Sequence, residues 1–204
     1  MPKIFASYTL SGCKKKVTLG GGIGDTRWVC WTHKNEIEVA KDYDGKDRSV
    51  DNICAAMWYG ICYDLINVKL CKNYDRAFLS AYSGLLYQAI VTLKVDNQYC
   101  GGFLLGAIKW TIKPDDKTCK RDSINGRCTP GDYSVILKLQ DLCDDVIAET
   151  IFHEIGHAIM YHMGYEEHEM NSETLINVMA GYLLEIFTTF SDKKLIGCLN
   201  FRRP

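Results

Sequence analysis

The chain has 204 residues, 47% of them hydrophobic, which is enough to bury a sizeable core in one domain or one and a half. With 24 basic residues against 25 acidic ones the net charge is −1, so the basic surplus typical of nucleic-acid-binding proteins is missing and no nucleic-acid partner is expected. No apolar run approaches the ~18 residues of a membrane span, and the first residues lack the apolar core of a signal peptide. We therefore expect a cytoplasmic protein with no membrane partner.

The first 48 residues are predicted to form short strands and turns. The run of three lysines at 14–16 is expected to be a solvated turn. The glycine-rich run at 20–24 lacks the lysine and hydroxyl residue of a phosphate-binding loop, so a flexible turn is expected there. Apolar residues three and four apart then predict two helices, Val50 to Leu70 and Asp75 to Leu93, which would form a helical hairpin of unknown role.

The second half of the chain alternates predicted strands and helices. Strand character returns between Tyr99 and Ile112, and a further strand is predicted over Ser134 to Leu139. Two helices follow, over Asp141 to Met163 and over Glu173 to Phe190. The predicted fold class is therefore α+β, with a mixed N-terminal region at 1–95 and a second domain at 96–204, in which a small sheet accompanies the two helices.

The helix predicted from Asp141 to Met163 is amphipathic. Carboxylates crowd its first turns, where they favour the positive end of the helix dipole, and Gly164 follows its last turn as a left-handed cap. Its apolar residues recur at three- and four-residue steps: Leu142, Val146, Ile151, Ile155, Ala158 and Ile159. They leave a polar stripe of Glu149, His153 and His157, spaced four residues apart, which we expect to face a cleft.

This helix carries the pattern H-E-x-x-H at residues 153–157. Two histidines four residues apart lie on one helix face, roughly 6 Å between Cβ atoms, so both imidazoles can reach one ion. Glu154 can then reach a water on that ion and accept its proton. The pattern is short and also arises by chance in ordinary helices. Its apolar flanks, the small Gly156 and a downstream acid favour a zinc site.

A catalytic zinc ion usually takes three protein ligands. His162 comes five residues after His157, roughly 140° round the helix from the zinc face. Positions 160 and 163 hold methionine, which excludes the metzincin pattern. His168 and the acidic residues around it are expected to be a solvated loop. Glu173 is favoured, because a short loop makes two helices antiparallel neighbours, although an acid at a helix start is also stabilising in itself.

The residues around the motif resemble a known family. The run from Glu149 to Ile159, followed by Glu173-x-x-x-Asn177, resembles the small zincin-like metallopeptidases encoded by phages and bacteria, including the ImmA/IrrE-like group, with gluzincin-type ligands. The upstream Gly106-Ala107-Ile108 and the strand leading into the helix fit as well, so the resemblance covers about residues 100–190. The polar stretch Lys113 to Gly131 is an insertion relative to the compact family pattern.

The resemblance implies zinc held by His153, His157 and Glu173, with Glu154 as the general base. It also implies that the strand before the helix forms a sheet edge, along which an extended peptide can lie near Tyr133–Leu139. The donor that would stabilise the oxyanion stays open among five residues: Tyr133, Tyr161, His162, Tyr165 and His168.

Two classes of function follow from these residues. The first is a zinc-dependent metallopeptidase that acts on a peptide or protein substrate. The alternative is a phage structural or interaction protein that retains a zincin fold with or without zinc, in a host cell or a virion. A zinc-dependent enzyme that hydrolyses a different type of bond would use the same residues. Glu154 favours an enzyme, because a purely structural zinc needs no base and normally closes its fourth position.

Ten cysteines is a high number for a chain expected inside a cell, and we expect free thiols. No C-x-x-C occurs, so a structural zinc ribbon has little support. Cys119 and Cys128 flank a polar loop and are the pair to suspect of a disulfide if the protein acts outside a cell.

Overall fold

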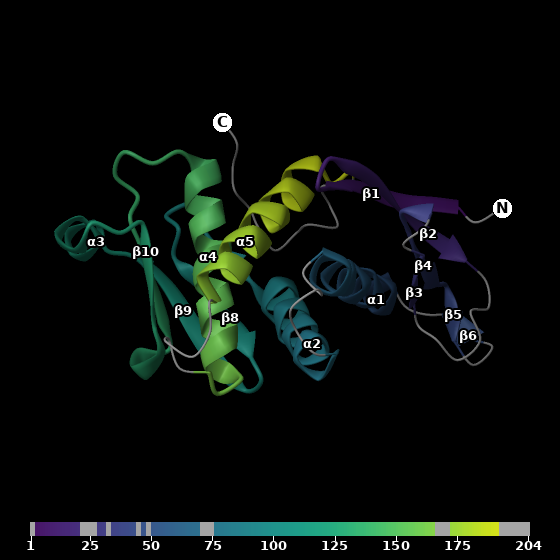
Figure 1. Cartoon of the computed structure of the whole chain (residues 1–204), viewed down its shortest axis with the longest axis horizontal. Coiled ribbons are helices and arrows are strands. Elements are labelled where there is room, and N and C mark those ends of the chain that lie inside the picture. Colours follow the sequence, from purple (N-terminus) through teal and green to yellow (C-terminus); the bar gives the residue numbers. More distant parts are fainter. Residues whose placement is uncertain are drawn as a thin grey trace. The chain divides into compact units, whose positions relative to one another are not determined.

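The structure, a computed structural model, describes residues 3–20, 28–31, 34–43, 46–47, 50–69, 76–165 and 172–191. The chain is mixed α and β and divides into two compact units (Figure 1). The first comprises the described residues up to Gly84 and from Glu185 on, and the second runs from Leu85 to Leu184. These boundaries fall inside two helices, whereas the sequence places a single boundary between 95 and 96. No helix in the described part of the chain is long and apolar enough to cross a membrane.

Strands make up the start of the first unit, as predicted. One sheet has the order β1-β2-β4-β3, with β2 parallel to β4 and the other pairs antiparallel. Two further strands of two residues each pair with one another. The bounds are β1 Lys3–Leu10, β2 Cys13–Gly20, β3 Trp28–Trp31, β4 Glu36–Ala40, β5 Asp42–Tyr43 and β6 Lys46–Asp47.

The two predicted helices of the N-terminal half are present with changed bounds. The first is α1 (Val50–Tyr63), which continues as a π-helical segment over Asp64–Lys69, and the second is α2 (Arg76–Thr92). Their connection at 70–75 lies outside the described residues, and so does the glycine-rich run from 21 onward. Trp58 of α1 stacks on Phe187 at 5.3 Å between ring centroids, which ties the end of the C-terminal helix into this unit.

The expectation of a solvated lysine turn at 14–16 is wrong, because all three lysines lie in a strand and the central one is buried. These lysines lie in β2, where successive side chains alternate between faces, and Lys15 is 3% exposed. Its ammonium lies 3.1 Å from the fully buried carboxylate of Asp64, the first residue of the π-helical segment. The hydroxyl of Tyr8 donates to the same carboxylate at 3.1 Å. Lys15 is thus a buried ion-pair partner that joins the sheet to the helix.

The second unit contains a sheet of order β10-β11-β9-β8-β7. β11 is parallel to β9, and the other neighbours are antiparallel. The strand predicted over Tyr99 to Ile112 is in fact a hairpin, because Gly106 turns the chain at a φ of 58°. The bounds are β7 Lys94–Val95, β8 Gly101–Leu105, β9 Ile108–Pro114, α3 Asp116–Asp122, β10 Gly126–Thr129, a 3-10 turn Pro130–Asp132 and β11 Ser134–Leu137.

Two long helices follow the sheet, α4 (Asp144–His162) and α5 (Ser172–Thr189). Within the second unit α4 lies across β10 and β11, and α5 crosses α4 (Figure 1). The residues of α4 that turn away from solvent include Ile151, Ile155 and Ile159, each fully buried. This packing confirms the amphipathic pattern predicted for α4 and fixes the orientation of its polar stripe.

The buried ion pair of the first unit yields a stability prediction. Replacing Lys15 by methionine leaves the Asp64 carboxylate buried without its counter-charge, so we expect the free energy of unfolding to fall by about 3–5 kcal/mol. Lys14→Met makes the same change at an exposed neighbour on the same strand. It should alter the free energy of unfolding by less than about 0.5 kcal/mol. Urea denaturation of both variants measures the difference, and equal effects would contradict a buried pair.

Candidate metal centre

Helix α4 carries the H-E-x-x-H pattern, as predicted, but begins later than expected. Asp141 takes a left-handed conformation with a φ of 64°, so the helix starts at Asp144 and not at Asp141. Its end follows the prediction. Gly164, with a φ of 83°, donates to Tyr161 at 2.9 Å, and the next amide donates to Met160 at 3.1 Å, which is the Schellman pattern of a helix end.

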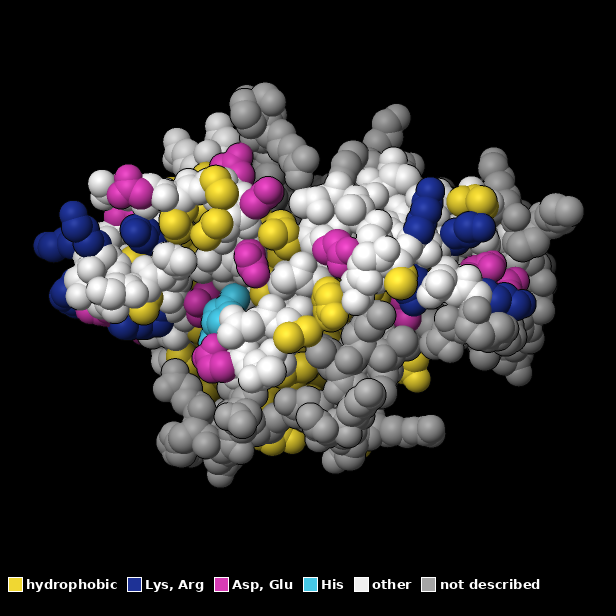
Figure 2. Space-filling model, turned by 45° about the horizontal axis from the view of Figure 1, so that its top comes forward, with side chains coloured by type: hydrophobic (Ala, Val, Ile, Leu, Met, Phe, Trp, Pro, Cys, Tyr) yellow, Lys and Arg dark blue, Asp and Glu magenta, His cyan; other side chains and the backbone are white. Residues whose placement is uncertain are grey.

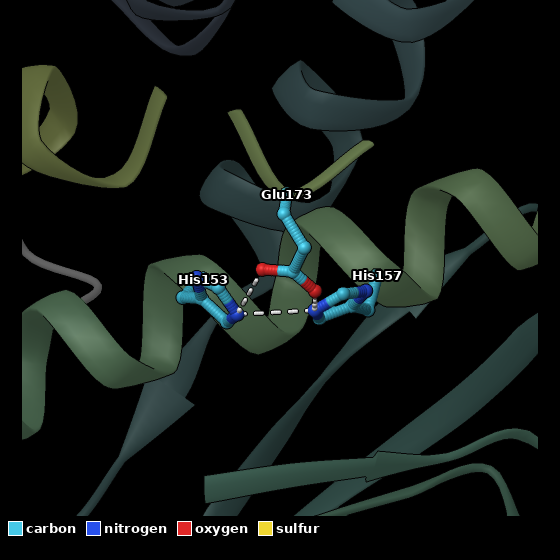
Figure 3. Close-up of side chains that lie close together, drawn as sticks. All are labelled: His153, His157 and Glu173. Carbon is cyan, nitrogen blue, oxygen red and sulfur yellow. Dashed lines mark hydrogen bonds and ion pairs between the residues drawn. The ribbon is translucent and has the colours of Figure 1, made fainter. Parts of the chain in front are cut away.

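Three side chains converge on one point between α4 and α5 (Figure 3). The Nε2 atoms of His153 and His157 lie 3.0 Å apart. Glu173 reaches them from the first turn of α5, with one carboxylate oxygen 3.1 Å from His157 Nε2 and the other 3.6 Å from His153 Nε2. The structure therefore brings together the three residues that the sequence predicts as metal ligands.

The distances suit a tetrahedral zinc ion. Ligand atoms about 2.0–2.1 Å from such an ion lie roughly 3.3 Å from one another, and the three measured separations bracket that value. Two imidazoles and one carboxylate also form a ligand set used by catalytic zinc sites, which leaves a fourth position open. The donors present therefore fit zinc in both type and spacing.

Glu173 reaches the histidines because α5 approaches α4 closely at Gly156. A Cβ atom at Gly156 would lie 2.9 Å from side-chain carbons of both Ile176 and Met179 on α5. Real Cβ contacts are essentially never that short, so any other residue would require the side chains of Ile176 and Met179 to shift. The small residue between the two histidines thus sets how near α5, and with it Glu173, can come.

His162, the other candidate ligand within the described residues, does not join this cluster. His162 packs near the turn between β8 and β9, where a Cβ at Gly106 would lie 3.1 Å from its Nε2 atom. His168 and the acidic residues around it lie outside the described residues. Among the candidate oxyanion donors, Tyr133 and Tyr161 stand edge-on against the buried ring of Trp110, at 5.5 and 6.4 Å between ring centroids.

Glu154 lies against Gly126 of β10, lines the same cleft as His153, and is only 5% exposed. Burial raises the pKa of its carboxyl group to about 7, and the negative charge of Glu173 adds to the rise. The backbone amide of Cys128 donates to the carboxylate, and the positive charge of Arg127 acts in the same direction, so both oppose the rise. A carboxyl group that titrates near neutral pH can both accept and release a proton there.

The sheet edge beside the motif helix is β10 and not the strand that the sequence predicts as the edge. β11, which corresponds to the predicted strand Ser134–Leu139, lies between β10 and β9 and so cannot form the edge. The edge strand β10 comes from the polar stretch Lys113 to Gly131, which therefore supplies part of the site. A Cβ at Gly126 would lie 2.6 Å from Thr150 and 2.9 Å from the Glu154 carboxylate. Glycine is what allows β10 to lie this close to α4.

A cleft of about 340 Å³ opens beside the histidines and runs toward the start of α4. Figure 2 shows acidic side chains next to the exposed histidine on this face, with no lysine or arginine adjoining it. The predicted polar stripe contributes Glu149 and His153, and α5 contributes Asn177, one turn below Glu173. The remaining lining residues are Ile124, Asn125, Gly126, Val146, Thr150, Glu154 and Ala180. Asn125 and Gly126 were not predicted, because an Asn-Gly pair in a polar stretch is typical of a turn.

The suspected cysteine pair is not bonded in the structure. Cys119 is buried and Cys128 is half-buried on β10, and neither forms a disulfide.

Comparison with known proteins gives no relative on which to base an assignment. No protein-family model matches the chain, and neither a curated protein nor a solved structure is significantly similar to it. The chemistry of the site is therefore argued from its own residues.

The contact at Gly126 predicts a cost for adding one methyl group. Gly126→Ala places a Cβ inside the contact distance of Thr150 and Glu154, so the free energy of unfolding should fall by about 1–3 kcal/mol. Gly131→Ala is the matched control, because a Cβ there meets nothing within 4 Å. Chemical denaturation compares the two. A Gly126→Ala variant as stable as the control would contradict the close approach of β10 to α4.

The raised pKa of Glu154 predicts how the metal-free protein responds to pH. Its folded-state pKa of about 7 exceeds the ordinary value of 4.5 for glutamate, so the folded protein holds the proton more tightly than the unfolded chain does. This contribution to stability is present below pH 4.5 and is lost as pH rises through 7, up to roughly 3 kcal/mol in total. The free energy of unfolding, measured with a metal chelator present, should fall more between pH 5 and pH 8 in the wild type than in Glu154→Gln. Parallel losses in the two proteins would show that Glu154 is not the titrating group.

Proposed function

We propose that the chain is a zinc-dependent metallopeptidase whose second unit is zincin-like. The observation that carries this proposal is the convergence of His153, His157 and Glu173 beside the buried carboxyl group of Glu154. A purely structural zinc would need the three ligands and a fourth, but it would not need a buried acid next to them. In a hydrolytic site, each of these four residues has a role.

The two histidines and Glu173 would hold the zinc ion in this proposal. When bound, zinc would supply a water of lowered pKa and would polarise the carbonyl group of the bond to be cleaved. The histidine nitrogens that face one another must both be unprotonated to act as ligands. Glu173 contributes a negative charge, which offsets part of the charge of the ion.

Glu154 is the general base of the proposed reaction. Its carboxylate would accept a proton from the attacking water and pass it to the nitrogen of the leaving amine. The Cys128 amide donates to the carboxylate, and Glu154 lines the cleft together with Gly126. A pKa near 7 in the metal-free protein is in the range that suits a group which must take up and then release a proton.

A peptide substrate would bind along β10. This strand is the edge of its sheet, and a sheet edge offers unpaired backbone groups to an extended chain. A peptide antiparallel to β10 would run from the Thr129 end toward the Gly126 end. Its residues before the scissile bond would then lie near Thr129, and its residues after that bond would lie near Gly126.

Metal content tests the proposal first. Protein purified without added metal should contain about one zinc ion per chain by mass spectrometry, as three convergent ligands predict. His153→Ala and Glu173→Ala should each lose the zinc, while His162→Ala, on the same helix but outside the cluster, should keep it. Glu154→Gln should also keep the zinc and should lose hydrolysis of a randomised peptide library. A wild type that takes up no zinc even on reconstitution would contradict the proposal and favour an interaction protein with a zincin-shaped scaffold.

A further inference from the structure

The cleft beside the metal centre lies where the part of a substrate after the scissile bond would be in the proposed reaction. It starts at His153 and Glu154 and continues past Thr150 and Val146 toward the beginning of α4. The end of the cleft at β10 is Gly126, the first residue of that strand. In a peptide antiparallel to β10, the side chain nearest to this space belongs to the residue that follows the scissile bond.

Among the described residues that line the cleft are two glutamates, Glu149 and Glu154, and no lysine or arginine. Glu149 lies one helical turn before His153. Its carboxylate is directed across the cleft toward α5, because a Cβ built at Gly181 would lie 3.7 Å from Glu149 Oε1. Glu149 is exposed, and within the described residues neither a hydrogen bond nor an ion pair engages it. Its charge is thus open to a group that enters the cleft.

Two amides complete the polar lining. Asn125 precedes β10, and Asn177 lies on α5, so they lie on different elements from Glu149. Their carbonyl oxygens can accept hydrogen bonds from an ammonium or guanidinium group. Apolar contributions from Ile124 and Val146 suit the aliphatic part of a long basic side chain, which packs along apolar surface while its charged end stays near polar groups.

We propose that this cleft binds the side chain of the residue that follows the scissile bond, and that Glu149 makes it selective for lysine or arginine. The inference rests on the proposed peptidase function and names its substrate class. Glu149 touches the substrate side chain and not the reacting atoms, so it determines specificity and takes no part in the chemistry. An acidic side chain at that substrate position would meet like charge and be rejected.

Ligand binding tests the inference without any turnover. Two succinyl hydroxamates that differ only in the side chain beside the zinc-binding group, 4-aminobutyl or butyl, are titrated into the zinc-loaded protein by calorimetry. We expect the aminobutyl compound to bind about three- to fivefold more tightly to the wild type, a preference of the size that an exposed charge pair gives. The ratio should fall toward one in Glu149→Gln and should shrink as salt concentration rises. Asp141→Asn, an exposed acid just before α4, should retain the full ratio.

Cleavage of a randomised decapeptide library separates failure of the inference from failure of the proposed function. Mass spectrometry should find lysine or arginine after the cleaved bond in the wild type, no such preference in Glu149→Gln, and a shift toward aspartate or glutamate in Glu149→Lys. Cleavage without a basic preference, or hydroxamates that bind equally well, would overturn the inference and leave the peptidase in place. No cleavage and no hydroxamate binding would overturn the proposed function, and the inference with it.

Discussion

The close approach of α5 to α4 at Gly156 is the constraint on which the rest of the site depends. The glycine leaves no room for even one additional carbon between Ile176 and Met179. With the helices this close, the first turn of α5 lies over the motif, and the Glu173 carboxylate meets both histidine nitrogens. Metal ligands tolerate errors of only a few tenths of an ångström, so the proposed ligand set should be sensitive to a side chain added at Gly156.

A second close approach, between Gly126 and α4, produces the unusual environment of Glu154. Removing a carboxylate from water costs free energy, which is why burial raises its pKa to about 7. One amide hydrogen bond from Cys128 offsets only part of that cost. A fold gains no stability from such a group near neutral pH. Functional sites are where proteins keep ionisable groups of this kind, and the burial that destabilises the carboxylate also brings its pKa to a useful value.

The sequence predicts the site where local periodicity determines it, and fails where distant partners do. His153 and His157 share a face because of helical geometry alone, and Glu173 follows from the short connection between two helices. The edge strand β10 has four residues, with a glycine and an arginine and no alternating apolar pattern, so only its pairing with β11 reveals it. Lys15 was misjudged for a related reason, since its partner Asp64 lies 49 residues further along the chain.

Burial distinguishes the roles that we propose for the two glutamates of the cleft. Glu154 is shielded from water and already holds an amide hydrogen bond, so a second, charged partner would require further desolvation in a confined space. Glu149 is exposed and can exchange part of its hydration for a cationic side chain at little cost. One acid is therefore suited to moving a proton and the other to selecting a substrate, although they lie five residues apart on the same helix. Because their environments differ, each role can be removed by mutation without the other.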